Sequence, residues 1–146
     1  GVSEFFPFIS SRTLVQSTDL SEKKRIRWER IIREAAEQSH RGRLPVLTAP
    51  KKYGESLSAI CVRHDLSLIA WEGAERNKSS LKEIIEPFQG STIALIVGPE
   101  GGFSEKEIDR AKKAGCHVIT LGERILRMET AAVVFPALVL YELGEL

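Results

Sequence analysis

The chain has 146 residues, of which 42% are hydrophobic and 28% charged, and its formal net charge is +1. This length fits one domain that buries its own core without disulfides. No apolar run reaches the roughly 18 residues of a membrane span, and no signal peptide is visible, so we expect a cytoplasmic protein without a membrane partner. Because the chain begins with Gly1 rather than Met, we expect a piece of a longer protein or a processed product.

Hydrophobic periodicity and turn residues predict strands that alternate with helices. The expected strands cover 5–9, 44–47 (a short extended piece), 66–71, 92–97 and 117–121. Five helices are expected. The first begins at Asp19 or Ser21 and ends near Ser39, the second begins at Ser56, and the third begins at a capping box of Ser80 and Glu83. The fourth begins at a second capping box of Ser104 and Glu107 and ends at Gly115, and the fifth runs from near Thr130 to near Gly144. In the first helix, Ile26, Ile31, Ile32, Ala35 and Ala36 are the candidates for the apolar face. The alternation predicts an α/β fold with a mostly parallel sheet and helices on both faces.

Positive charge is concentrated in the first third of the chain. Residues 1–52 contain 11 Lys and Arg against 6 Asp and Glu, whereas residues 53–146 contain 10 against 14. A basic segment suits an anionic partner such as RNA, although a solvated helix face has the same composition. The two cysteines, Cys61 and Cys116, form no CxxC pair, so we expect reduced core cysteines and no metal site.

The last expected helix has no polar face. Its apolar residues are Ala131, Ala132, Val133, Val134, Phe135, Ala137, Leu138, Val139 and Leu140. A helix that is apolar all round has to be covered on all sides, and a domain of this size rarely covers its own terminal helix so completely. We therefore expect a homodimer through the C-terminal helix, with a central core helix as the alternative.

The segment IVGPEGGFS, residues 96–104, joins the end of a buried strand to a capped helix through a Gly/Pro-rich turn. Ligands bind at the carboxyl ends of parallel strands, where glycines let the backbone approach closely. The segment lacks both the Gly-Lys-Ser/Thr ending of a triphosphate loop and the GxGxxG spacing, and Glu100 would repel phosphates. A neutral or zwitterionic ligand fits better, and a purely structural turn is the alternative.

The segment LGERILRMETA, residues 121–131, is a second loop between a strand and a helix. It carries two arginines and two acids around the apolar pair Ile125 and Leu126. Such charges beside a fully apolar helix are costly unless they are paired or functional. We expect a functional loop, and arginines in structural salt bridges are the alternative.

Together, GPEGGFS (98–104) and LGERILRMETA (121–131) resemble the signature of the bacterial 16S rRNA uracil-N3 methyltransferases, which belong to the SPOUT superfamily. The stretches GVSE (1–4) and EAAEQSHR (34–41) are also similar to that family, so the resemblance covers nearly the whole chain. It implies that residues 1–146 are one SPOUT methyltransferase domain with a C-terminal trefoil knot, without the family's N-terminal PUA-like RNA-binding domain. It also implies a homodimer that acts on 16S rRNA of the small ribosomal subunit. The implied cofactor is S-adenosyl-L-methionine, which becomes S-adenosylhomocysteine, and no metal is implied.

The resemblance also assigns roles to individual residues. The implied cofactor-binding residues are Val97, Gly98, Pro99, Glu100, Gly101, Leu121, Gly122, Ile125, Leu126 and Thr130, with Ala70, Trp71 and Glu72 as further candidates. The implied catalytic residues are Arg127 and Arg124, as cations near the uracil oxygens, and Glu129 (or else Glu100) as the acceptor of the N3 proton. The implied RNA-binding residues are Arg33, Gln38, Arg41 and Arg43.

Three other interpretations stay open. The Gln-Ser stretch and the ILRMET sequence argue against a SPOUT enzyme with a tRNA target. The missing phosphate and dinucleotide motifs argue against a nucleotide-binding or redox domain. A non-catalytic RNA-binding module would leave the two charged loops without an explanation.

Overall fold

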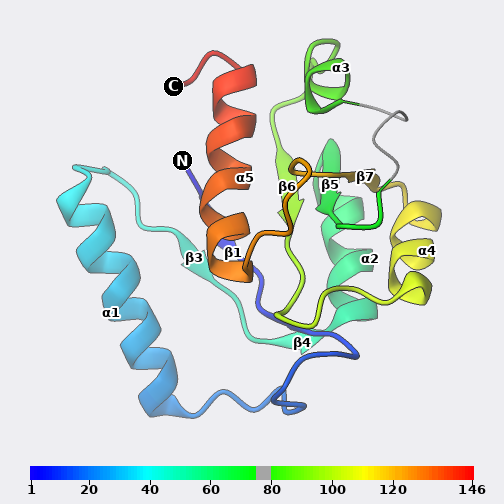
Figure 1. Ribbon diagram of the computed structural model, residues 1–146. Coiled ribbons are helices and arrows are strands. Elements are labelled where there is room, and N and C mark those ends of the chain that lie inside the picture. The colour runs from blue at the N-terminus through cyan, green and yellow to red at the C-terminus, as the bar shows by residue number, and fades with distance from the viewer. Residues whose placement is uncertain (75–79) are drawn as a thin grey trace.

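The computed structural model describes residues 1–74 and 80–146, and strands alternate with helices along the chain (Figure 1). The strands are β1 (Glu4–Phe5), β2 (Phe8–Ile9), β3 (Val46–Leu47), β4 (Lys51–Lys52), β5 (Leu66–Ala70), β6 (Ile93–Ile96) and β7 (His117–Ile119). The helices are α1 (Glu22–Gln38), α2 (Tyr53–Arg63), α3 (Leu81–Ile85), α4 (Glu105–Lys113) and α5 (Met128–Glu142). The expected α/β class is confirmed.

The centre of the fold is a parallel three-stranded sheet in the order β6-β5-β7. Successive residues of a strand point to opposite faces, and in β5 both Leu68 and Ile69 are fully buried. Ile69 packs on one face with residues of α2 and α4, among them Leu57 and Ile108. Leu68 packs on the other face with α3 and α5, where Phe135 is also fully buried. Helices therefore cover both faces of the parallel sheet, as the sequence predicts.

Both capping boxes are confirmed. Ser80 and Glu83 begin α3, and each accepts a hydrogen bond from the backbone N–H of the other. Ser104 and Glu107 begin α4, where the backbone N–H of Ser104 donates to the Glu107 carboxylate at 2.9 Å. Gly115, with φ +92°, follows α4 and turns the chain toward β7.

The prediction of one continuous strand over residues 5–9 is wrong. Pro7 separates β1, which pairs with β3, from β2, which pairs with β4, and both pairs are parallel. Proline has no N–H to give to a ladder, and the carbonyl of Pro7 instead accepts from the N–H of Lys51. Two short parallel pairs therefore replace the expected strand.

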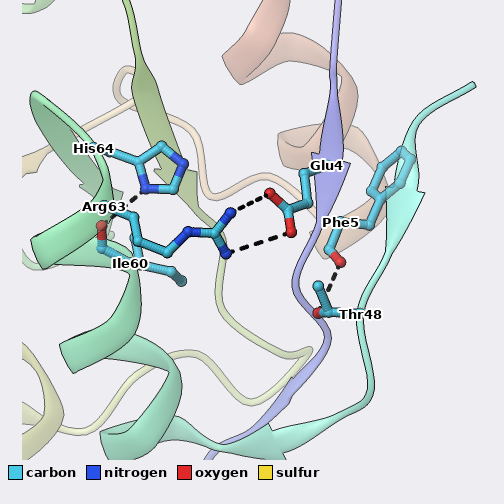
Figure 2. Close-up of polar contacts among 6 residues, drawn as sticks. All are labelled: Glu4, Phe5, Thr48, Ile60, Arg63 and His64. Carbon is cyan, nitrogen blue, oxygen red and sulfur yellow. Dashed lines mark hydrogen bonds and ion pairs between the residues drawn. The ribbon is translucent and has the colours of Figure 1, made fainter. Parts of the chain in front are cut away.

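The end of α2 is tied to β1 (Figure 2). The guanidinium of Arg63 donates to both carboxylate oxygens of Glu4, with a shortest N–O distance of 3.0 Å. In the last turn of the same helix, Nδ1 of His64 lies 2.8 Å from the carbonyl oxygen of Ile60. The Arg63–Glu4 ion pair attaches β1 to a helix that covers the central sheet, and the His64–Ile60 contact lies within the end of that helix.

The stripe of α1 that faces the rest of the chain follows Trp28, Ile32 and Ala36 at four-residue spacing; Ala36 is buried, and Trp28 and Ile32 are half-buried. Ile26, which was expected on this face, is 55% exposed because it lies on nearly the opposite side of the helix from Trp28. An apolar cavity of about 300 Å³ lies between α1 and the N-terminal strands, and Trp28, Ile32 and Phe5 line it.

Two helices begin earlier than expected. α2 starts at Tyr53 rather than Ser56, directly after β4, and α5 starts at Met128 rather than Thr130. Neither helix has a side-chain hydrogen bond at its N-cap, which is the signal on which a boundary prediction rests. At α1 that signal is present, and Ser21 rather than Asp19 is the cap.

One stripe of α5 is buried, formed by Ala131, Phe135 and Val139 at four-residue spacing. Val133 is 73% exposed and Tyr141 68% exposed, so α5 is not a central core helix within this chain. Among the helices in the described residues, none combines the length and apolarity needed to cross a bilayer.

Candidate functional site

The carboxyl ends of β5, β6 and β7 lie at one edge of the parallel sheet. A cavity of about 540 Å³ opens there, within the range of about 300–1,000 Å³ found for small-molecule sites. Its lining residues come from three segments, 70–74 after β5, 97–103 after β6 and 120–131 after β7. Both loops that the sequence singled out therefore contribute to one site.

The wall formed by the loop after β6 has little room for side chains. A Cβ at Gly98 would lie 3.1 Å from the buried ring of Phe103. Gly102 has φ +66°, and a Cβ there would lie 2.7 Å from the carboxylate of Glu72. The N–H of Gly102 donates to the carbonyl of Pro99 at 2.8 Å and closes a tight turn. At Gly98 and Gly102 the backbone itself therefore forms the wall of the cavity.

The carboxylate of Glu107, only 6% exposed, anchors the helix that follows this loop. It accepts from the backbone N–H groups of Ser11 and Ser104 at 2.8 and 2.9 Å, and from both of their hydroxyls. Burial raises the pKa of Glu107, but the hydrogen bonds from Ser11 and Ser104 outweigh burial and hold the pKa below its ordinary value. The carboxylate is therefore charged, and it fixes the start of α4 behind the loop.

The loop after β7 contains a second glycine turn. Gly122 has φ +117°; its carbonyl accepts from the hydroxyl of Thr120 at 2.9 Å, and its N–H donates to that hydroxyl oxygen at 3.3 Å. Ile125, which is 82% exposed, and the half-buried Leu126 follow on the cavity wall. A large apolar side chain that stays exposed at a cavity is typical of a binding surface.

The same wall carries opposite charges. Arg127 is the N-cap residue of α5, and Glu129 lies in its first turn, where a carboxylate is favourable to the helix dipole. Within the residues that the structure describes, neither Arg124 nor Arg127 forms an ion pair. Salt bridges inside this part of the chain therefore do not account for the two arginines, and both can face an anion or a developing negative charge.

The predicted cofactor-binding residues gather at the cavity, with the exception of Thr130. Those that line it are Val97, Gly98, Pro99, Glu100, Gly101, Leu121, Gly122, Ile125 and Leu126, and the predicted catalytic residues Arg124, Arg127 and Glu129 line it as well. Ala70, Trp71 and Glu72 complete the wall at the end of β5. Thr130 is exposed on α5 and does not line the cavity, whereas its helix neighbours Glu129 and Ala131 do.

The cavity is also lined by residues to which the sequence assigned no role: Ala74, Gly102, Phe103, Thr120, Glu123, Met128 and Ala131. A threonine two residues before a turn glycine is a recognisable signal, because its hydroxyl bonds locally to the backbone. Met128 and Ala131 carry no such signal, since an apolar residue at the start of a helix has the same appearance in a core.

The predicted RNA-binding residues lie outside the cavity wall. Arg33 and Gln38 are exposed on α1, and Arg43 is exposed after it. Arg41 is half-buried, and its guanidinium donates to the carbonyl of Val2 at 2.6 Å. A single copy of the chain does not bring these four residues to the cavity.

The cysteines Cys61 and Cys116 are both free thiols, with their Sγ atoms 3.2 Å apart. Across residues 1–74 and 80–146, no group of three or more His, Cys, Asp or Glu side chains is arranged to hold a metal ion.

A family profile described as an RNA methyltransferase domain matches residues 1–140, which include every segment that lines the cavity. The ribosomal RNA small subunit methyltransferase E of Mesomycoplasma hyopneumoniae (strain 232) is 39% identical over 133 residues, 91% of this chain and 56% of that protein. The protein of that name from Synechocystis is 37% identical over 136 residues, 92% of this chain and 43% of its own length. The chain thus spans about half the length of these curated relatives.

Solved structures have the same fold. A methyltransferase of Legionella pneumophila in complex with S-adenosylmethionine superposes with a TM-score of 0.80 at 30% identity, over 97% of this chain and 56% of that one. The ribosomal RNA small subunit methyltransferase E of Neisseria gonorrhoeae, also bound to S-adenosylmethionine, gives a TM-score of 0.78 at 31% identity, over 97% and 55% of the two chains.

Proposed function

The chain belongs to the RNA methyltransferase domain family, and from that premise we propose that it transfers a methyl group from S-adenosylmethionine to N3 of a uridine in 16S ribosomal RNA. One observation carries the proposal: the two loops that resemble the uracil-N3 methyltransferase signature, although separate in sequence, line the same cavity at the carboxyl edge of the sheet. The names of the relatives support ribosomal RNA of the small subunit as the substrate.

The chemistry of the cavity wall fits S-adenosylmethionine. The backbone wall at Gly98 and Gly101 allows a ligand to approach closely, and Ile125 and Leu126 offer apolar surface to an adenine ring. Carboxylates at the wall, such as Glu100, favour a ligand that carries positive charge over a polyphosphate. The Legionella and Neisseria structures contain this cofactor, which supports the same ligand here. When bound, it supplies an electrophilic methyl group on a sulfonium.

The side chains on the loop after β7 suit uracil as the methyl acceptor. Neutral uracil holds a proton on N3 and has no in-plane lone pair there for attack on a methyl group. Arg127 and Arg124, placed near O2 or O4 of the base, lower the pKa of N3 by stabilising the anion. Glu129, or Glu100 in its place, takes the N3 proton. The N3–CH3 bond forms as the S–CH3 bond breaks, and S-adenosylhomocysteine leaves with the electron pair on sulfur.

The RNA is held outside the cavity in this proposal. The uridine has to be unpaired or flipped out of its stack to reach the site. Arg33, Gln38, Arg41 and Arg43 contact the RNA around it, mostly through phosphates, which position the strand rather than select its sequence. An enzyme with this substrate works where ribosomes are, in the cytoplasm.

We further propose that residues 1–146 form one SPOUT domain whose C-terminal part threads a trefoil knot. The order β6-β5-β7 supports this, because the chain passes from β6 across β5 to β7, and the loops after β6 and β7 then meet at one cavity. We also propose a homodimer through α5, supported by the exposed apolar side chains of Val133, Leu138 and Tyr141.

The first test is a calorimetric titration of S-adenosylmethionine into the protein, repeated with Gly98→Val and Leu126→Arg. We expect saturable binding that both substitutions abolish, since one closes the backbone wall and the other puts a charge on the apolar wall. Val62→Arg is the matched control for Leu126→Arg, because Val62 is 87% exposed on α2 and does not line the cavity. A folded wild-type protein that binds no cofactor would refute the proposal.

The second test is methylation of small ribosomal subunits, followed by digestion and mass analysis of the nucleosides. We expect N3-methyluridine in the 16S rRNA. Methylation of tRNA alone would assign the chain to another branch of the SPOUT enzymes.

A further inference from the structure

We infer that Arg12 is a positioning residue that holds the glycine-rich wall of the cavity in its binding conformation. This inference rests on the proposed function. Arg12 lies in the segment after β2, 89 residues before the loop that it contacts, and it has no place in either motif.

Arg12 contacts the loop at Gly101. Its guanidinium Nη1 donates to the carbonyl oxygen of Gly101 at 3.0 Å. A Cβ added at Gly101 would lie 3.0 Å from the Cβ and 3.3 Å from the carbonyl oxygen of Arg12, so the two backbones are close together. Gly101 thus forms part of the cavity wall while Arg12 packs against it.

The hydrogen bond fixes one particular peptide group. The peptide between Gly101 and Gly102 donates its N–H to the carbonyl of Pro99, and Arg12 binds the carbonyl at the opposite end of the same peptide. Two successive glycines have few steric barriers to rotation, so without Arg12 only the hydrogen bond to Pro99 would hold this peptide. Arg12 therefore supplies the second of the two hydrogen bonds that hold this peptide in its orientation at the cavity wall.

Arg12 is itself held in place by neighbours on both sides of the turn that contains it. The N–H of Thr13 donates to the carbonyl of Ser10, and the N–H of Ser10 donates to the hydroxyl of Thr13. Ser11 is bound to the buried carboxylate of Glu107, as described above. The segment is thus docked on the start of α4, and the guanidinium has a fixed base from which to reach Gly101.

The test replaces Arg12 and measures both cofactor affinity and loop mobility. Arg12→Met keeps the length of the side chain and removes the donor, whereas Arg12→Lys keeps a charged donor. Arg30→Met is the control, because it removes the same charge from the exposed surface of α1. We expect Arg12→Met to weaken the binding of S-adenosylmethionine about tenfold, with most of the affinity restored in Arg12→Lys. The unfolding midpoint should not change, because the hydrogen bond is exposed.

Amide hydrogen exchange distinguishes a failure of this inference from a failure of the proposed function. We expect the amides of Gly101, Gly102 and Phe103 to exchange faster in Arg12→Met than in the wild type, with or without cofactor. Unchanged cofactor affinity and unchanged exchange would overturn the role of Arg12, as would a loss of affinity that only follows a loss of stability. A wild-type protein without cofactor affinity, in which exchange still depends on Arg12, would overturn the methyltransferase proposal and leave the positioning role standing.

Discussion

The backbone N–H and the hydroxyl of Ser11 both donate to the carboxylate of Glu107, at 2.8 and 3.0 Å, although 96 residues separate the two. Ser104 donates to the same carboxylate as the other half of a capping box. One buried charge therefore joins the N-terminal segment, the glycine-rich loop and the start of α4. The arrangement requires the ionised form of Glu107, because all four donors need acceptors.

This requirement predicts an acid-sensitive contribution to stability. The hydrogen bonds hold the folded-state pKa of Glu107 below its ordinary value of 4.5, so the unfolded chain binds this proton more readily. The stabilisation is thus complete above pH 4.5 and is lost as the pH falls through the lower folded-state pKa. Glu107→Gln should lower the free energy of unfolding near neutral pH by about 1–3 kcal/mol, the cost of leaving buried donors without acceptors.

Urea unfolding of the wild type and Glu107→Gln between pH 3 and pH 7 measures this effect, and the two stability curves should converge at the acid end. The remaining acid dependence of the variant includes Asp65, whose pKa is lowered by hydrogen bonds from Ser91 and Thr92. Parallel curves for the two proteins over the whole range would contradict the prediction.

The capping box of Ser104 and Glu107 shows what the sequence could reveal at this site, because its two residues are three positions apart. The bond from Ser11 could not be predicted, since a contact across 96 residues depends on the path of the chain. The same limit applies to Pro7, which lies in an apolar run that looks like one strand until its two halves find different partners. The cavity was predictable because both of its loops carry long local motifs.

The two cysteines provide a test of the packing between α2 and the residue that precedes β7. Cys116 is 6% exposed, and burial, together with the neighbouring Cys61, raises the pKa of its thiol. Because the thiolate is the reactive species, Cys116 should resist alkylation at pH 8 in the folded protein and react only after unfolding. The measurement is iodoacetamide labelling of Cys61→Ser, with Cys116→Ser as the partner variant. Rapid labelling of Cys116 in folded Cys61→Ser would show that this part of the core is not closed.

Arg127, in the loop after β7, is expected to act in the methyl transfer and not in cofactor binding. Arg127→Met should lower kcat about 100-fold or more, the usual loss when a group that stabilises developing negative charge is removed. The affinity for S-adenosylmethionine should stay within about twofold of the wild type, because in this proposal Arg127 stabilises the uracil anion in the transition state and does not hold the cofactor. Single-turnover methylation of small ribosomal subunits, combined with calorimetry, separates the two quantities. Equal losses in affinity and rate would instead place Arg127 in the cofactor site.

The choice between Glu129 and Glu100 as proton acceptor can be settled by a pair of amide substitutions. Glu129→Gln should remove most of the methylation rate, and Glu100→Gln should keep most of it, since only Glu129 shares the second loop with the two arginines. Glu105→Gln is the control, because Glu105 is exposed on α4 and does not line the cavity. The reverse ranking of the two acids would assign the proton to Glu100.

The uniform apolarity of α5 predicted that the helix has to be covered, but the sequence did not reveal which residues this chain covers by itself. Helical spacing alone allows several stripes. The packing of α5 against α3 and the sheet selects Phe135 and Val139, and Ala131 on the same stripe lies at the cavity. The apolar side chains of Val133, Leu138 and Tyr141 stay exposed in the single chain.

These exposed side chains predict that the proposed homodimer can be broken without unfolding the chain. Val133 is 73% exposed, so Val133→Asp places a charge in solvent in the single chain but in the proposed interface of the homodimer. We expect the dissociation constant of the dimer to rise about 100-fold or more, because an unpaired charge buried in an interface costs several kcal/mol. Sedimentation velocity should find a wild-type dimer and a Val133→Asp monomer with the same helix content by circular dichroism. Val62→Asp is the matched control, since Val62 is 87% exposed on α2, and it should leave the dimer intact. A wild-type protein that sediments as a monomer at high concentration would exclude α5 as a homodimer interface.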